Sequence, residues 1–168
     1  FSYGAENSME VILDKQYIQD LASHRMYSNI VANSVWPNQC DFNPTKQCVD
    51  AFAMTNGLGI NDAGSGFDPY DPYVNRDPRL AATVYYIGSI LPDGNVYDSR
   101  PNSGTGDGLG FAENTTATGF NDKKYLNPED LDDPWNSGVN LILLRYADIL
   151  LMYAEAKIEL GQIDQSVL

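Results

Sequence analysis

The segment 141–160, LILLRYADILLMYAEAKIEL, is the only stretch long and apolar enough to form a deeply buried helix. At about 100° per residue, its charged side chains fall on one narrow stripe, and apolar side chains cover the rest of the circumference. This pattern predicts a helix that other elements cover on several sides. Arg145 and Asp148 are three residues apart and can pair. Gly161 follows the last apolar position and predicts the end of the helix.

The charge of the chain is strongly acidic. Asp and Glu number 23 against 10 Lys and Arg, which gives a net charge of −13 at pH 7. This balance argues against nucleic acid and anionic membranes as partners, and it favours a neutral or cationic ligand. Most of the acidic residues are expected to solvate the protein surface. No uncharged apolar run reaches the roughly 18 residues that a bilayer requires, so the sequence predicts no membrane span.

The N-terminal part contains one segment with two interpretations. Asn7 and Glu10 resemble a helix capping box, whereas the β-branched residues that follow favour a strand. We predict a strand over 11–17. Residues 45–54 predict a short helix or turn, because Pro44 sets the direction of the chain before them.

The middle of the chain predicts a small β-hairpin near residues 80–97. Residues 80–87 are rich in β-branched and aromatic side chains, which favours a strand. The sequence PDGN at 92–95 is typical of a tight turn that would return the chain through Val96 and Tyr97.

Long loops are predicted between these elements. Residues 25–43 lack a hydrophobic period and predict an ordered loop, and residues 99–118 predict a mobile surface loop. The glycines of 99–118 do not match a nucleotide-binding loop, because Leu109 stands where the pattern needs Gly. The loop 55–68 has Asp and Asn oxygens that suit calcium, but it lacks the alternating acidic ligands and closing Glu of an EF-hand, so we predict no metal there.

Cys40 and Cys48 are the only cysteines. They flank a turn-like Asn43-Pro44 and could close a small disulfide loop in an oxidising compartment. The favoured alternative is that Cys48 is a small buried apolar residue. Two thiols and a distant His24 do not have the spacing of a zinc site.

Three stretches in order resemble one known family. They are CVDAFAMTNG at 48–57, YDPYVNRDPRLAATVY at 70–85, and RYAD followed by an apolar run and YAEA at 145–156. Residues 119–125 also resemble the segment that precedes the last of these motifs in the family. On these residues the chain is similar to the SusD/RagB family of outer-membrane nutrient-binding lipoproteins of Bacteroidetes.

The resemblance implies a fold and an extent. The expected fold is mainly α with long irregular loops and a small β-hairpin, as part of a SusD-like, tetratricopeptide-like helical protein. Residues 1–168 would all belong to the SusD/RagB domain. Because family members are longer, we interpret the chain as an internal or C-terminal-region fragment that lacks the N-terminal helical repeats and the C-terminal end.

The resemblance also implies a function. The expected function is non-catalytic binding of glycan at the cell surface and its delivery to a SusC-like TonB-dependent outer-membrane transporter. A lipid anchor outside this chain would hold the protein at the outer membrane, and no cofactor is expected. The alternatives are capture of peptides or another nutrient by a RagB-like protein, a glycoside hydrolase, and a structural subunit that contacts no ligand.

Enzymatic activity finds little support in the residues. His24 is the only histidine, and no Gly-x-Ser-x-Gly motif is present. Glu155 and Glu159 are one helical turn apart and could imitate a glycosidase pair, but a structural ion-pair stripe with Arg145 explains them better. The sequence therefore predicts a protein that is not an enzyme.

A binding site for sugars is better supported. Proteins stack aromatic rings on the CH faces of sugars and bind hydroxyl groups with Asp, Asn or Arg. The chain has 11 Tyr, 6 Phe and 2 Trp, and several lie in loops beside Asn or Asp. The alternative is that such rings only pin irregular loops. The predicted platform residues, chosen from their chemistry, are Trp36, Asn38, Tyr70, Asp71, Tyr73 and Trp135.

Overall fold

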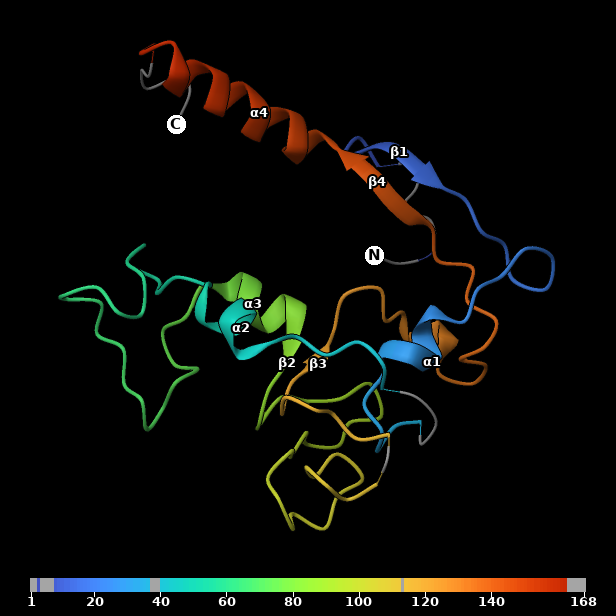
Figure 1. The fold of residues 1–168 in the computed structure, drawn as a ribbon. Coiled ribbons are helices and arrows are strands. Elements are labelled where there is room, and N and C mark those ends of the chain that lie inside the picture. The colour runs from blue at the N-terminus through green and yellow to red at the C-terminus, as the bar shows by residue number, and fades with distance from the viewer. Residues whose placement is uncertain (1–2, 4–7, 37–39, 113, 163–168) are drawn as a thin grey trace.

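The computed structural model describes residues 3, 8–36, 40–112 and 114–162, which form an irregular body and a projecting arm (Figure 1). The elements in chain order are β1 (Val11–Lys15), α1 (Met26–Ile30), α2 (Lys46–Asp50), α3 (Pro78–Thr83), β2 (Val84–Tyr85), β3 (Asn121–Asp122), the 3-10 helix η2 (Pro128–Asp130), β4 (Leu141–Arg145) and α4 (Tyr146–Glu159). Helices take up less than a quarter of the chain. The prediction of a mainly α fold is therefore wrong.

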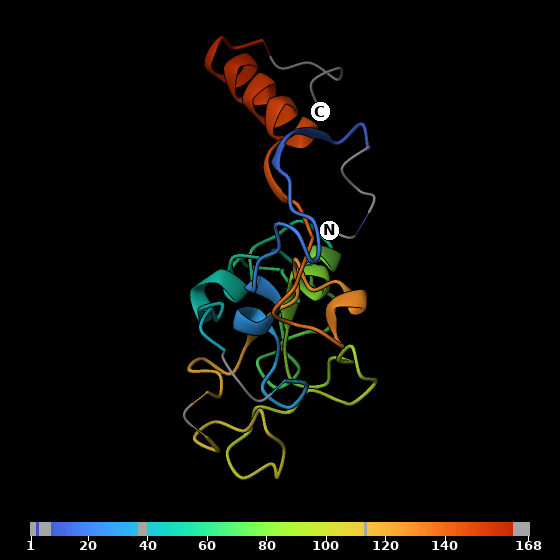
Figure 2. The ribbon, with the colours of Figure 1, turned by 90° about the vertical axis from the view of Figure 1, so that its right-hand side faces the viewer.

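The arm consists of β1, β4 and α4. β1 and β4 pair antiparallel, with Val11 opposite Arg145 and Lys15 opposite Leu141, and the register shifts between them. α4 continues directly from β4. Both views show α4 extending away from the body (Figures 1 and 2). No residue of α4 is buried, and none of the described helices is long and apolar enough to cross a membrane.

The prediction of one buried helix over 141–160 is wrong in two respects. Its first five residues form β4, because β1 lies alongside and takes up their backbone hydrogen bonds. Its remaining residues are helical but exposed. Three smaller predictions are confirmed: the strand at 11–17 appears as β1, Arg145 pairs with Asp148 at 3.7 Å, and the helix ends before Gly161, whose φ of 64° suits glycine.

The body has two small apolar clusters that meet at β2. One contains the buried residues Ala32, Tyr85, Leu91 and Tyr97, and the other contains Val49, Leu80 and Val84. Val84 and Tyr85 are the two residues of β2, and successive side chains of a strand point to opposite faces. The strand therefore supplies one residue to each cluster. Its partner is β3, with Val84 opposite Asp122.

The predicted β-hairpin is only partly present. Residues 80–83 belong to α3, because the Asp77 carboxylate accepts the Arg79 N–H at 2.8 Å and Pro78 occupies the first turn. The turn at 92–95 is confirmed: the Leu91 N–H donates to the Asn95 carbonyl at 2.9 Å, and Ile90 bridges Val96. β2 is the strand of this region, and it pairs with β3 and not with residues 96–97.

The loops of the body are packed by polar contacts. Asp107 is buried and accepts the Ser34 N–H at 2.9 Å and the Ser34 hydroxyl at 2.5 Å, and the Ser99 hydroxyl donates to the Gly119 carbonyl at 2.7 Å. Ser99 and Asp107 are buried, so the prediction of a mobile surface loop over 99–118 is wrong for these two residues. Both cysteines are free: Cys40 is buried and Cys48 is exposed, so the prediction that Cys48 is buried is also wrong.

Candidate functional site

Residues 68–73 form a rigid turn that presents the most exposed aromatic ring of the predicted platform. The Asp68 carboxylate accepts the Tyr70 N–H at 2.9 Å, and its carbonyl accepts the Asp71 N–H at 3.1 Å. Pro69 and Pro72 fix their own φ angles within the turn. The result is a Tyr70 side chain that is 97% exposed, beside the exposed Asp71.

Tyr73 anchors this turn to the body. Its ring stacks on Tyr86 with centroids 4.1 Å apart and planes 17° from parallel, and it packs against the cluster of Val49, Leu80 and Val84. Burial raises the pKa of the Tyr73 hydroxyl, and the neighbouring Tyr86 acts in the same direction. One face of the Tyr73 ring is thus already occupied by another aromatic side chain.

Arg76 ties the same turn to α2. Its Nη1 donates to the Pro72 carbonyl at 3.0 Å, and its Nη2 donates to the carbonyls of Val49 at 2.6 Å and Phe52 at 2.8 Å. The side chain is buried, and its Nε has no partner among the described residues. These bonds link the turn to carbonyls at and just beyond the C-terminal end of α2.

The other predicted platform residues lie elsewhere. Trp36 is half-buried, and its indole Nε1 is buried without a partner in the part of the chain that the structure describes. Asn38 lies outside the described residues. Trp135 is 41% exposed, and the Arg25 guanidinium lies 5.7 Å from its ring. The loop that carries Tyr70 lies beside α2 and α3, whereas the segment of Trp135 lies beside α1 on the other side of the body (Figure 1).

The structure also contains a groove that the platform residues did not predict. One pocket of about 630 Å³ lies between α2, α3 and the end of β4, and a second pocket of about 450 Å³ lies beside β2 and the turn at 92–95. Both pockets share Ala82 and Lys124 as lining residues. The two pockets therefore adjoin at these residues, and we call them together the groove.

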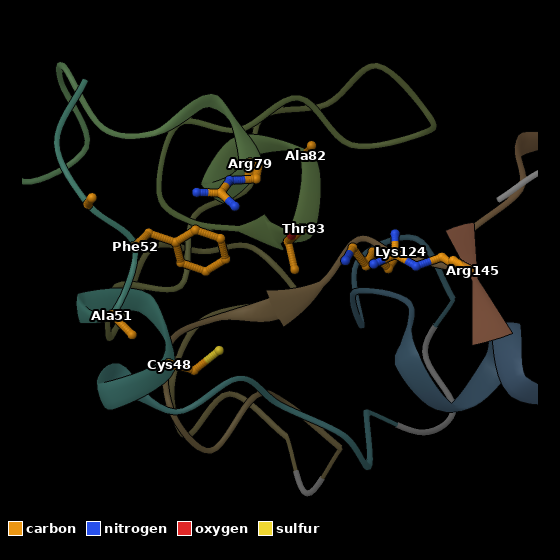
Figure 3. A pocket seen from close by; sticks show the side chains of 9 residues that line it. Cys48, Ala51, Phe52, Arg79, Ala82, Thr83, Lys124 and Arg145 are labelled. Carbon is orange, nitrogen blue, oxygen red and sulfur yellow. The ribbon is translucent and has the colours of Figure 1, made fainter. Parts of the chain in front are cut away.

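Phe52 and Cys48 form one wall of the larger pocket. In Figure 3 they lie on the side of α2, with Arg79 above them, while Lys124 and Arg145 lie at the opposite side. The smaller pocket adds Tyr125 and Lys123 to the lining. The groove thus combines aromatic and aliphatic surface with four cationic side chains.

Three of these cations have fixed positions. Arg79 pairs with Asp77 at 2.5 Å, and hydrogen bonds from Arg79 lower the pKa of the Asp77 carboxyl to about 2. Lys123 donates from Nζ to the Ala81 carbonyl at 2.9 Å. Arg145 pairs with Asp148 at 3.7 Å. The groove is therefore a preformed polar site.

A signal for the groove was present in the sequence. Arg79, Lys124 and Arg145 each belong to a stretch that carries the family resemblance, namely residues 70–85, 119–125 and 145–156. The stretches are far apart in the chain, so periodicity and local motifs could not show that their cations share one pocket.

Catalytic and metal chemistry have few candidate groups. The His24 Nδ1 accepts the Met26 N–H at 3.1 Å, so its Nε2 carries the proton and donates to the Val139 carbonyl at 2.8 Å. Both ring nitrogens thus serve the fold. Glu155 and Glu159 are exposed on the arm. Among the described residues, no three His, Cys, Asp or Glu side chains form a cluster that could hold a metal ion.

Comparisons with known proteins place this geometry in a family. The family model that matches residues 9–168 is described as the SusD family. A structure of a SusD-like carbohydrate binding protein from Bacteroides fragilis superposes with a TM-score of 0.80 and 25% identity, covering 95% of this chain and 31% of that chain. A SusD-like protein from the same organism gives a TM-score of 0.65 and 25% identity, covering 96% and 34%. No curated protein matches the chain.

The chain therefore spans about a third of the length of the solved structures that it resembles. The resemblance predicted from the three sequence stretches is confirmed, because the family model covers nearly the whole chain and both structures share its fold. The chain belongs to the SusD family.

Proposed function

We propose that the chain is part of a cell-surface protein that binds glycan without cleaving it and passes it to a SusC-like TonB-dependent transporter. The observation that carries this proposal is the match to the SusD family together with a TM-score of 0.80 to a structure described as a carbohydrate binding protein. A lipid anchor outside this chain would hold the protein at the outer membrane.

The turn at 68–73 supplies a surface for sugar stacking. A sugar ring needs an open aromatic face with hydrogen-bonding groups nearby. Tyr70 has such a face, and Asp71 is exposed next to it. The two prolines, the hydrogen bonds to Asp68 and the hydrogen bond from Arg76 to the Pro72 carbonyl fix the conformation of the turn without a ligand. Less conformational entropy is therefore lost when a sugar binds.

A binding role without catalysis is consistent with the available groups. Glycosidases use two carboxyl groups that flank the scissile bond, about 5 to 10 Å apart. Asp71 stands on an exposed turn, and the Asp77 carboxyl is engaged by Arg79. Hydrogen bonds from Arg79 lower the pKa of the Asp77 carboxyl, which is the opposite of what a general acid needs.

The test is affinity electrophoresis of the chain through gels that contain a panel of neutral and acidic polysaccharides. We expect retardation by at least one of them, with an apparent affinity reduced about two- to tenfold by Tyr70→Ala, because one stacking ring contributes about 0.5 to 1.5 kcal/mol. Tyr153→Ala is the matched control, since Tyr153 is an exposed tyrosine on the arm. Trp36→Ala and Trp135→Ala test the other two platform positions.

Other outcomes distinguish the alternatives. Release of reducing ends from the retarding polysaccharide would contradict the non-catalytic role and favour a glycoside hydrolase. Binding of peptides with no retardation by any polysaccharide would contradict glycan capture and favour a RagB-like function. An equal loss of affinity for the polysaccharide in Tyr70→Ala and Tyr153→Ala would show that the turn at 68–73 is not part of the binding site.

A further inference from the structure

The charge around the groove is opposite to that of the chain. Acidic residues outnumber basic residues 23 to 10 over the whole sequence. Yet no Asp or Glu is among the described residues that line the two pockets, whereas four of the ten cations do so, namely Arg79, Lys123, Lys124 and Arg145. The acidic partners Asp77 and Asp148 approach Arg79 and Arg145 without lining the pockets.

Arg79 keeps a hydrogen-bond donor for a ligand. Asp77 is engaged by the Nε and Nη2 of Arg79, and Nη1 makes no hydrogen bond among the described residues. The Arg79 side chain is exposed, although its pairing with Asp77 fixes the plane of the guanidinium. Such an orientation favours a further charge-assisted bond to a carboxylate or sulfate, because little side-chain entropy remains to be lost.

Net charge does not prevent an anion from reaching this site. At physiological ionic strength, charges more than about 8 Å away are largely screened. The charges within that distance, namely the four cations together with Asp77 and Asp148, therefore determine the potential inside the groove. The net charge of −13 acts mainly while the ligand is still distant. The preference for a neutral or cationic ligand that composition suggests does not apply to this surface.

The shape of the groove fits a polymer better than a single ion. Two pockets of about 630 and 450 Å³ adjoin at Ala82 and Lys124, so a chain of sugars could contact both. Cations occur along both parts, with Arg79 and Arg145 in the larger pocket and Lys123 in the smaller one. Phe52 and Tyr125 add ring surface between them.

We propose that the groove binds an acidic glycan, with the anionic groups of successive sugars on Arg79, Lys123, Lys124 and Arg145 and the sugar rings against Phe52 and Tyr125. This inference rests on the proposed glycan-binding function and specifies its substrate class. The anionic groups are carboxylates, as in uronic acids, or sulfates, and the two sources are separated by experiment.

The first experiment compares polymers that differ only in charge. The chain is run through gels that contain polygalacturonate or its fully methyl-esterified form, and separately dextran or dextran sulfate. We expect polygalacturonate to bind at least about tenfold more tightly than the ester, and the difference to shrink as NaCl rises from 50 to 500 mM. Binding of dextran sulfate alone would assign the anion as sulfate instead of carboxylate.

The second experiment uses variants matched for charge and contact. Arg79→Gln is compared with Arg100→Gln, because Arg100 binds Asp98 through the same three donor–acceptor contacts but lines neither pocket. Lys124→Gln is compared with Lys46→Gln, another exposed lysine. All four change the net charge equally. We expect about three- to tenfold weaker binding of the polyanion only for Arg79→Gln and Lys124→Gln.

Cys48 reports occupancy of the groove directly. Its thiol is exposed and lines the larger pocket, while Cys40 is buried and serves as the internal reference. Bound glycan should slow alkylation of Cys48 by neutral iodoacetamide at least about threefold, because the polymer covers the thiol. The ester should give no protection at the same concentration.

The outcomes separate this inference from the proposed function. Equal binding of polygalacturonate and its ester, with loss in Tyr70→Ala, would overturn the acidic-glycan inference and leave glycan capture intact. Equal effects of Arg79→Gln and Arg100→Gln would show that only net charge matters and would overturn the groove as the site. Equally tight binding of polyglutamate, which has no sugar, would overturn the assignment to a glycan.

Discussion

The body and the arm of this chain differ in how regularity relates to burial. The arm has the longest helix and the only five-residue strands in the described chain, yet no residue of α4 is buried. The body has very short elements joined by long loops, and it contains every buried apolar residue of the two clusters. Regular backbone and stable packing therefore occur in different parts of the molecule.

The difference follows from what satisfies the backbone. Helix α4 satisfies its own peptide groups, so it can extend away from the body and leave Leu150, Leu151 and Tyr153 exposed. The loops of the body have no such repeat, and side chains such as Asp107 and Arg76 make hydrogen bonds to their backbone groups instead. Most buried backbone groups of the loops need such a partner.

The largest effect is expected from a matched pair of leucines. Leu80 in α3 is 1% exposed, and Leu151 in α4 is 69% exposed. Leu80→Ala should lower the free energy of unfolding by about 2 to 5 kcal/mol, because it leaves a cavity in the cluster with Val49 and Val84. Leu151→Ala should change it by less than about 0.5 kcal/mol. Urea unfolding followed by circular dichroism measures both.

The reverse order would break the comparison. If Leu151→Ala lowered the free energy of unfolding as much as Leu80→Ala, the arm would be packed in solution, for example by self-association. Sedimentation at two protein concentrations would detect that association.

The second effect concerns the buried arginine. Arg76→Leu would remove the guanidinium that donates to the carbonyls of Pro72, Val49 and Phe52, and Val49 would keep only the Phe52 N–H. We expect a loss of about 3 kcal/mol in unfolding free energy, since each buried unsatisfied group is costly. Arg100→Leu is the control on an exposed arginine and should leave the urea midpoint unchanged. An unchanged midpoint for Arg76→Leu would mean that water replaces the guanidinium.

Local sequence signals could predict part of this fold. The β-branched run of β1, the short helix that follows Pro44 and the PDGN turn depend on signals within a few residues, and each appears where it was predicted. The strand β4 could not be predicted in this way. Its residues LILLR suit a helix equally well, and the choice depends on β1, about 130 residues earlier in the chain.

The same limit applies to the candidate site. Tyr70 and Asp71 are local to one turn, and the turn could be predicted from its prolines. The groove depends on Arg79, Lys124 and Arg145 meeting in space, which requires the fold. The acidic composition predicts a neutral or cationic ligand, whereas the cations that line the two pockets support the proposal of an acidic one, because composition averages over the surface and a pocket does not.

A third effect should appear in the pH dependence of the body. Burial raises the pKa of the Asp107 carboxyl above its usual value, so the folded state favours the protonated form. The stability from this group is fully present below the unfolded pKa of about 4, and it is lost as pH rises through the folded pKa. Asp107→Asn cannot ionise, and its amide oxygen can still accept the Ser34 N–H.

The stability of Asp107→Asn relative to the natural chain should therefore increase as the pH rises from about 3.5 to 6.5. Urea midpoints measured across this range for both proteins give the difference, in which the other carboxyl groups cancel. A constant difference across the range would contradict a raised pKa at this position.

The smallest effect compares two helix N-termini, one in each region. The Thr45 hydroxyl accepts the Cys48 N–H at 3.2 Å at the start of α2, and the Asp148 carboxylate accepts the Arg145 N–H at 2.8 Å at the start of α4. Thr45→Ala should cost about 1 kcal/mol in global stability, because α2 buries Val49 in the body, and Thr45→Ser should restore it. Asp148→Ala should leave the urea midpoint unchanged and only speed amide hydrogen exchange in the first turn of α4, because α4 opens without disturbing the body. A shift of the global midpoint by Asp148→Ala would show that the arm and the body unfold as one unit, and the distinction between them would then hold for burial but not for cooperativity.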